Sequence, residues 1–307
     1  MKRPLVTQPL VTQPLVTQPL VTQPLVTQPL ATRPLATRPL GTTSLLTAVA
    51  AAVPAALAAA HCAPVLSTFG PLRNRVMPRL AGKGRADHVA LTFDDGPDPQ
   101  STPEFLRLLA ARRVRATFFL LGSQAHRSPG LVREIAAAGH EIAVHGWAHR
   151  PLLLRGPRAT HTDLARARDT VAEITGTPPT LFRPPYGVMS GSAHLAARRL
   201  GLTPVLWTCW GEDWTARATP ESVHRTVVTD LFGGGTVLLH DSDCTSAPGA
   251  WRSALGALPR ILDTCEERGY EVGPLRDHGS PPPRRAPLRP SAGPAAPPAA
   301  ASPAGRP

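Results

Sequence analysis

The sequence predicts an α/β fold: a small, distorted (β/α) barrel of seven strands, with disordered chain flanking it at both ends. Apolar runs suited to strands alternate with helical segments between residues 88 and 273, which favours a parallel sheet with crossover helices. Glycines stand where several of these helices would end. With 37 prolines and few aromatic residues, the 307-residue chain is expected to have unstructured flanks around a smaller folded core.

The expected elements follow one another in a regular alternation. Gly139, Gly201 and Gly269 stand just after three of the helices, where a left-handed residue caps the last turn. In a barrel of this kind, side chains at the carboxyl ends of the strands meet on one rim. The strands are expected at 88–93, 116–121, 140–145, 180–184, 203–208, 235–240 and 270–273, and the helices at 102–113, 128–138, 158–175, 191–200, 219–231 and 249–268.

The first flank, residues 1–43, contains eight tandem five-residue units that begin at Pro4. A proline at every fifth position removes backbone donors, so this segment is expected to be extended and disordered. It is either a spacer or translated repeat DNA upstream of the true start. Residues 67–85 are expected to be a linker, and the Pro/Ala-rich residues 278–307 a disordered tail.

Residues 44–66 are expected to be a signal peptide or a membrane anchor. The run at 45–60 is rich in Ala, Leu and Val and ends in a small-residue cleavage pattern, which suits a signal peptide. Extended to Leu66 it becomes long enough to span a bilayer. Export is therefore predicted, with an extracytoplasmic location at the cell envelope, although the arginines that follow would favour a cytoplasmic flank.

Charge and cysteine content narrow the classes of partner. The formal net charge is +12, but the arginines are scattered and accompany no nucleic-acid motif, so no nucleic-acid partner is expected. A basic surface suits an anionic envelope polymer. No cysteine pair has zinc-finger spacing. In an exported domain, Cys209, Cys244 and Cys265 would provide one disulfide and one free thiol, with the pairing left open. A monomer is expected.

Chemically active side chains follow five of the expected strands. Asp94 and Asp95 end the first strand, and adjacent buried carboxylates are costly unless a cation lies between them. A solvated turn is the alternative for this pair, because Asp, Gly and Pro are common turn residues. The other strand ends carry, in order, His145 and His149, Arg183, Asp213 and Trp214, and His240 and Asp241.

His145 and His149 are four residues apart, a spacing that places both rings on one side of a single helical turn. Two imidazoles and one carboxylate form a three-ligand site for a divalent metal and leave positions for water. An isolated pair of this kind is more often a surface helix face. Here a pair of acids ends a strand of the same barrel, which favours the metal site. The other histidines are assigned to surface positions or ordinary packing.

Five segments, in this order, resemble the motifs of the NodB-homology polysaccharide deacetylases, carbohydrate esterase family 4. They begin at Thr92 (Thr-Phe-Asp-Asp-Gly-Pro), His145 (to His149), Arg183 (Arg-Pro-Pro-Tyr-Gly), Asp213 (Asp-Trp) and Leu238 (Leu-Leu-His-Asp). The resemblance leaves out both flanks and implies a deacetylase domain over residues 86–277. It also implies a hydrolase acting on non-peptide carbon–nitrogen bonds of a polysaccharide.

The resemblance gives the metal side of the site its roles. Asp95, His145 and His149 would bind a divalent metal, most commonly zinc, with cobalt, nickel or manganese as alternatives. Asp94 would be the general base that takes a proton from the attacking water. Arg183 would hold Asp94 ionised and oriented through a charge-assisted contact.

The resemblance also implies roles on the leaving-group side. His240 would protonate the departing amine, and Asp213 would fix its charge and tautomer. A backbone N–H near Tyr186 would stabilise the oxyanion. Trp214 and Leu238 would line the acetyl pocket. A proton donor for a poor leaving group mildly favours N-acetyl over O-acetyl substrates.

Two positions depart from the family pattern. Gly146 stands where Ser or Thr is usual, which implies a weaker metal site. Trp210 stands where many members have an aspartate, so contacts to substrate are expected to differ. For Trp210, core burial and a binding role are equally acceptable from sequence. For Asp241, a supporting role in the site and a helix N-cap remain open.

The sequence therefore predicts a metal-dependent deacetylase of a polysaccharide that contains N-acetylglucosamine, of peptidoglycan or chitin type. The alternatives are an O-acetyl xylan esterase or small-amine deacetylase and, from another class, a non-catalytic glycan-binding envelope protein. Membrane association would come through residues 45–66. The sequence leaves open the polymer, the native metal and the cleavage of this segment.

Overall fold

The structure is a computed structural model that describes residues 42–279, with side chains from residue 50 onward. Apart from the first residues of helix α1 (Thr42–Cys62), the features below belong to one compact unit that begins at Ala50. The repeats expected at 1–43 and the tail expected at 278–307 lie almost entirely outside the described residues.

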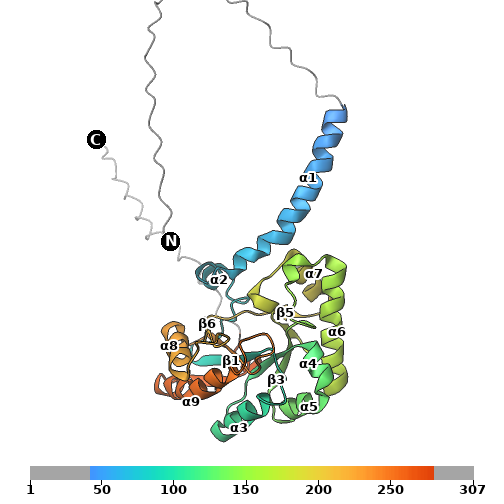
Figure 1. The fold of residues 1–307 in the computed structure, drawn as a ribbon. Coiled ribbons are helices and arrows are strands. Elements are labelled where there is room, and N and C mark those ends of the chain that lie inside the picture. Colours follow the sequence, from blue (N-terminus) through green and yellow to red (C-terminus); the bar gives the residue numbers. More distant parts are fainter. Residues whose placement is uncertain (1–41, 280–307) are drawn as a thin grey trace, which may run out of the picture. The chain divides into compact units, whose positions relative to one another are not determined.

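Eight parallel strands form a curled sheet in residues 42–279, and Figure 1 shows the helices around its outside. The hydrogen-bonded path runs β5–β4–β3–β2–β1–β7–β6, and β8 pairs with the first residues of β1. This architecture confirms the predicted (β/α) barrel. The strands are β1 (His88–Asp94), β2 (Thr117–Leu120), β3 (Glu141–Val144), β4 (Leu181–Phe182), β5 (Thr203–Pro204), β6 (Cys209–Trp210), β7 (Thr236–His240) and β8 (Glu271–Gly273).

The helices occur where the alternation predicts them, with additions near the amino terminus and after β2. They are α1 (Thr42–Cys62), α2 (Gly70–Val76), α3 (Thr102–Arg112), α4 (Gly122–Arg127), α5 (Pro129–Ala137), α6 (Pro157–Thr175), α7 (Gly191–Arg199), α8 (Pro220–Asp230) and α9 (Trp251–Glu267). Short 3-10 turns cover Ala63–Thr68, Leu152–Leu154, Pro185–Gly187 and Leu275–Asp277. The expected cap Gly139 has a φ of +79°, which only glycine adopts readily.

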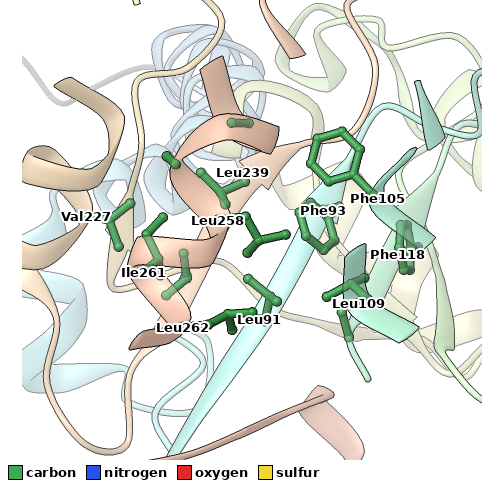
Figure 2. Packing of buried hydrophobic residues seen from close by; sticks show 14 of the residues in the cluster. Leu91, Phe93, Phe105, Leu109, Phe118, Val227, Leu239, Leu258, Ile261 and Leu262 are labelled. Atoms are coloured by element: carbon green, nitrogen blue, oxygen red, sulfur yellow. The ribbon is translucent and has the colours of Figure 1, made fainter. Parts of the chain in front are cut away.

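Strand β1 is buried along its whole length, and its alternation decides what faces the site. Leu91 and Phe93 point outward into the main core, where they meet side chains of α3 and α9 (Figure 2). Each fully buried Leu or Phe side chain contributes about 1.5–3 kcal/mol to folding. Thr92 and Asp94 therefore point to the inside of the barrel. The core holds β1 in place, and this fixes the position of Asp94, at the end of the strand, and of Asp95, which follows it.

The barrel has a seam between β5 and β6, which are not paired with each other within residues 42–279. A continuous strand over 203–208 is therefore wrong: β5 stops at Pro204, and residues 205–208 cross the seam as irregular chain. Side chains bind several of their carbonyls. Arg183 donates to the carbonyl oxygens of Val205 (3.2 Å) and Leu206 (2.9 Å).

The segment expected as a linker, 67–85, is mostly folded against the outside of this seam. Arg73 of α2 is only 4% exposed and donates to the carbonyl oxygen of Trp207 (2.7 Å). The amide of Leu206 donates to the carbonyl of Leu80 (2.7 Å). Residues 67–85 thus complete the barrel where strand pairing does not.

Candidate active site

Asp94 and Asp95 lie at the carboxyl end of β1 and are both buried, at 2% and 0% exposure. Asp94 is the last residue of the strand, whereas Asp95 has a φ of +78°, outside the strand conformation. This turn lets consecutive side chains face the same cavity instead of opposite faces. The alternative of a solvated turn is therefore wrong for this pair.

His145 and His149 come from the chain that follows β3. They do not share a helical turn: residues 145–150 are irregular, with positive φ at Gly146 (+84°) and His149 (+52°). The rings are nevertheless adjacent, with centroids 5.1 Å apart. The helical prediction failed because two left-handed residues bend the chain back on itself. Gly146 suits this bend, since a residue with a Cβ would be strained there.

Three potential ligand atoms converge between these segments. Asp95 Oδ1 lies 3.5 Å from His145 Nε2 and 3.6 Å from His149 Nε2. Ligands bound at about 2.0–2.2 Å in a tetrahedral arrangement are separated by about 3.3–3.6 Å, so this spacing fits a zinc-like ion. Asp95 Oδ1 is buried and has no hydrogen-bond partner among the described residues. An unpartnered buried carboxylate oxygen is costly, and a cation at this point would satisfy it.

Both histidines are prepared to act as ligands. His145 Nδ1 lies 2.8 Å from the carbonyl oxygen of Arg183, so it carries the ring proton and leaves Nε2 free. Burial lowers the pKa of His145 to about 3, despite the nearby Asp95, and lowers that of His149. Both rings are therefore neutral at physiological pH, which is the form that binds metal.

Arg183 lies at the end of β4 and is fully buried inside the barrel. Its Nη1 donates to Asp94 Oδ1 (2.7 Å) and to the Thr92 hydroxyl (2.8 Å). The guanidinium carbon lies 4.0 Å from the centre of the Phe119 ring. Burial raises the pKa of Asp94, and the Arg183 charge opposes that rise. Asp94 Oδ2 remains available 3.7 Å from His145 Nε2, beside the ligand atoms.

His240, the last residue of β7, faces this group across the cavity. Asp213 Oδ1 lies 3.0 Å from His240 Nδ1, and its Oδ2 accepts the His240 backbone N–H (2.7 Å). Burial alone would lower the pKa of His240, but Asp213, with Asp95 and Asp94, raises it to about 10. The ring is therefore held protonated in the metal-free protein, with Nε2 left for a substrate.

A cavity of about 290 Å³ joins the two sides, at the small end of ligand pockets. Trp214 and Leu238 line it, as does Tyr186, whose ring centre lies 4.4 Å from that of His149. Tyr186 has a φ of +60° and is 60% exposed, so its ring covers the rim instead of packing in the core. The structure thus brings the predicted site residues together at one rim: Asp94, Asp95, His145, His149, Arg183, Tyr186, Asp213, Trp214, Leu238 and His240.

Sequence reasoning missed several residues of the cavity. Thr245, in the loop after β7, donates a hydrogen bond to Asp95 Oδ2 and so orients the carboxylate. Trp207 also lines the cavity and was not predicted, whereas Trp210, for which a binding role was left open, lines it as well. The only sequence signal for Thr245 was its place in the loop after a strand. Hydroxyl residues are so common in such loops that this place does not single it out.

Asp241 is not a helix N-cap, because α9 begins only at Trp251. Its side chain accepts a hydrogen bond from Thr102 (2.5 Å), which ties the β7 end to the start of α3. All four cysteines lie in the described region and are free, without a disulfide.

Comparison with known proteins agrees with this geometry. The family model described as polysaccharide deacetylase matches residues 81–205. A chitooligosaccharide deacetylase of Bradyrhizobium sp. (strain ANU 289) is 33% identical over 195 residues, which are 61% of this chain and 88% of the relative. The chain belongs to the polysaccharide deacetylase family. The predicted family is thereby confirmed.

Other members of the family extend the comparison. A peptidoglycan-N-acetylglucosamine deacetylase of Listeria monocytogenes (serotype 1/2a, strain 10403S) is 34% identical over 183 residues, 60% of this chain, but the match spans only 37% of that protein. The solved structure of the Bc1960 peptidoglycan N-acetylglucosamine deacetylase superimposes with a TM-score of 0.59 at 28% identity. It covers 64% of this chain and 91% of the solved chain.

Proposed function

We propose that the chain is a metal-dependent hydrolase that removes N-acetyl groups from a polysaccharide containing N-acetylglucosamine, of peptidoglycan or chitin type. One observation carries the proposal. A carboxylate held by a buried arginine lies beside three metal-ligand atoms, and an imidazole held by a buried carboxylate lies across the same cavity. The relatives support the substrate class, since their names describe peptidoglycan-N-acetylglucosamine and chitooligosaccharide deacetylases.

Asp95, His145 and His149 would hold the ion, and two nitrogen donors with one carboxylate make zinc the first candidate, ahead of cobalt, nickel or manganese. A divalent ion bound there would polarise the acetyl carbonyl and make water a stronger nucleophile. Asp94 would take a proton from that water through Oδ2, the oxygen beside the ligand atoms. Arg183 would keep Oδ1 fixed during this transfer.

His240 would complete the reaction on the other side of the cavity. Water oxygen adds to the acetyl carbon, and a backbone N–H near Tyr186 would stabilise the charge on the former carbonyl oxygen. The carbon–nitrogen bond then breaks as His240 Nε2 gives its proton to the departing nitrogen. The products are acetate and the free amine of the sugar. Asp213 would stabilise the charged ring before this step and hold its orientation throughout.

We place this activity outside the cytoplasm, in a secreted or membrane-anchored protein acting on the cell envelope. The relatives named for peptidoglycan support this location, because that polymer lies outside the membrane. In the described residues, the segment Ala50–Thr68 is long and apolar enough for a membrane span. Its mean hydropathy is 1.5, and only 6% of the segment is buried. A signal sequence has the same properties.

Acetate release from N-acetylglucosamine oligomers tests the function. The full chain is stripped of metal with a chelator and then re-supplied with zinc or cobalt. We expect release that requires the metal and falls about 10²- to 10⁴-fold in Asp94→Asn. Asp87→Asn, at an exposed acid just before β1, is the control and should keep full activity.

Three results would replace the proposal. Release from acetylated xylan alone would identify an O-acetyl esterase, and release from small acetylated amines alone would identify a small-amine deacetylase. A metal-loaded protein that binds the oligomers but frees no acetate from any of these substrates would be a glycan-binding protein.

A further inference from the structure

Partly exposed aromatic rings form one continuous wall of the active-site cavity. Trp207 and Trp210 are stacked, with ring centres 5.7 Å apart and planes 25° from parallel. Trp210 and Trp214 follow at 4.9 Å, and Trp214 lies 5.8 Å from the His240 ring. The wall therefore leads directly to the group that would protonate the leaving amine.

Strand alternation turns Trp210 toward the cavity. Cys209, its neighbour in β6, is 1% exposed and belongs to the main core on the outside of the sheet. Trp210 must then point to the opposite face, where it pairs in register with Leu238, another cavity residue. Unlike core rings such as Phe93 and Phe118, which are fully buried, Trp210 keeps an exposed surface.

The other two tryptophans already have tasks, whereas Trp210 does not. Trp207 fills the space above Gly187, where a Cβ on that glycine would lie only 2.5 Å from the indole ring, and its carbonyl accepts from Arg73. Trp214 adjoins His240 and, with Leu238, is enough to enclose a methyl group. The partly exposed surface of the large Trp210 ring is explained if a ligand covers it.

The chemistry of the wall selects the ligand. Unlike Trp207, which has Arg73 and Arg183 near its ring, the Trp210 indole has no cation against it among residues 50–279, so its face suits the apolar, flat C–H face of a neutral pyranose ring. The cavity of about 290 Å³ is at the small end of ligand pockets, so a neighbouring sugar of a polymer must lie along its edge. The stack beside Trp214 offers the surface for it.

We propose that Trp210 forms a stacking subsite for the sugar next to the one that is deacetylated, an inference that rests on the proposed function. Trp210 thereby makes the enzyme prefer oligomers and polymers over a single sugar. It acts on substrate binding and does not take part in proton transfer. An aromatic contact of this size is worth about tenfold in affinity.

The test compares mono-, di- and tetrameric N-acetylglucosamine on the metal-loaded full chain. Trp210→Leu should raise KM for the tetramer about tenfold, leave kcat nearly unchanged and leave the monomer unaffected. Trp210→Phe keeps a ring and should restore most of the tetramer affinity. Trp251→Leu is the matched control, since Trp251 opens α9 and does not line the cavity, and its KM should not change.

Calorimetric binding of the tetramer separates this inference from the proposed function. If the wild type binds the tetramer, Trp210→Leu binds it about tenfold more weakly and neither protein frees acetate, the subsite stands and the proposed function fails. Equal tetramer affinity in wild type and Trp210→Leu overturns the subsite, as does an equal loss on monomer and tetramer. If Trp210→Leu fails to fold, Trp210→Met, which also lacks a ring but is flexible, takes its place in the comparison, and unchanged tetramer affinity in that variant overturns the inference.

Discussion

The two sides of the rim are built differently. The metal side rises from β1 and β3, strands whose length and burial fix Asp95 and His145 at their ends. The seam side, from β4 to β6, has strands of two residues each. Between β5 and β6, contacts between side chains and carbonyls replace strand pairing, including those of Arg73 and Arg183 to residues 205–207. Regular strands thus position two of the metal ligands, Asp95 and His145, whereas buried arginines hold the chain that carries the substrate wall.

The largest effect should come from the metal side. Asp95→Asn keeps the shape of the side chain but removes the anionic ligand. Loss of a group that only hydrogen-bonds to a metal ligand costs up to about 100-fold in metal affinity, so loss of this ligand should lower zinc affinity by more than that. Acetate release should fall with it. Titration calorimetry with zinc measures the affinity, and Asp98→Asn in the same loop is the matched control.

The stability of the metal-free Asp95→Asn variant gives a second test of the metal side. Without metal, Asp95 Oδ1 is a buried carboxylate oxygen without a partner among the described residues, so Asp95→Asn should leave the metal-free fold at least as stable as wild type. A clear loss of stability would mean that Asp95 serves the fold and not a cation.

Arg183 belongs to both sides, since it holds Asp94 and the seam carbonyls at once. Arg183→Met should lower the free energy of unfolding by about 3–5 kcal/mol, because it leaves Asp94 buried without its partner. Urea unfolding measures the change. Arg107→Met, at an exposed pair with Glu104, should cost less than about 1 kcal/mol.

A double variant identifies the source of that loss. If the unpaired charge dominates, Arg183→Met with Asp94→Asn should recover part of the stability lost in the single variant. If the seam contacts dominate, the double variant should recover nothing, and Arg183 would be primarily a seam residue.

Asp213→Asn tests the leaving-group side by pH. The carboxylate opposes the effect of burial and raises the pKa of His240 to about 10, so its removal should lower that pKa. The protonated ring is the proposed donor, so the basic limb of the activity profile should move to lower pH. An NMR titration of His240 in the metal-free protein measures the pKa directly. A basic limb that stays in place would assign proton donation to another group.

The raised pKa of His240 also predicts how the stability of the fold changes with pH, because a group that binds its proton more tightly in the folded state stabilises that state while it is protonated. Because the folded-state pKa of His240 is raised, its contribution to stability is complete below the unfolded value of about 6.5. It is lost as pH rises through about 10. Asp213→Asn should therefore destabilise the fold at neutral pH and should flatten this pH dependence.

The metal side could be predicted from the sequence because each of its residues lies at or shortly after the end of a strand that a local apolar run reveals. The apolar run before Asp94 and the motif order along the chain located the strands and the residues at their ends. Even there, the turn between His145 and His149 was predicted as helical, since spacing alone does not report left-handed residues such as Gly146.

The seam could not be predicted in the same way. The contact of Arg73 with Trp207 joins residues 134 positions apart through a side chain and a carbonyl, which leaves no periodic pattern in the sequence. For the same reason, residues 205–208 looked like a continuous strand, and 67–85 looked like a linker. The position of Trp210 depends on β6, a strand of two residues that no apolar run announces.

Arg73→Met gives the smallest effect and tests the seam by itself. Removing a buried donor to the Ser67 and Trp207 carbonyls should lower the free energy of unfolding by about 1–3 kcal/mol, with zinc affinity unchanged. Arg75→Met, two residues along the same helix and exposed, is the matched control and should have little effect. If the two variants unfold alike in urea, residues 67–85 act as a tether and the barrel closes without them. If Arg73→Met alone is weakened, the segment is part of the barrel, and a fragment that starts after residue 85 should lose at least as much stability.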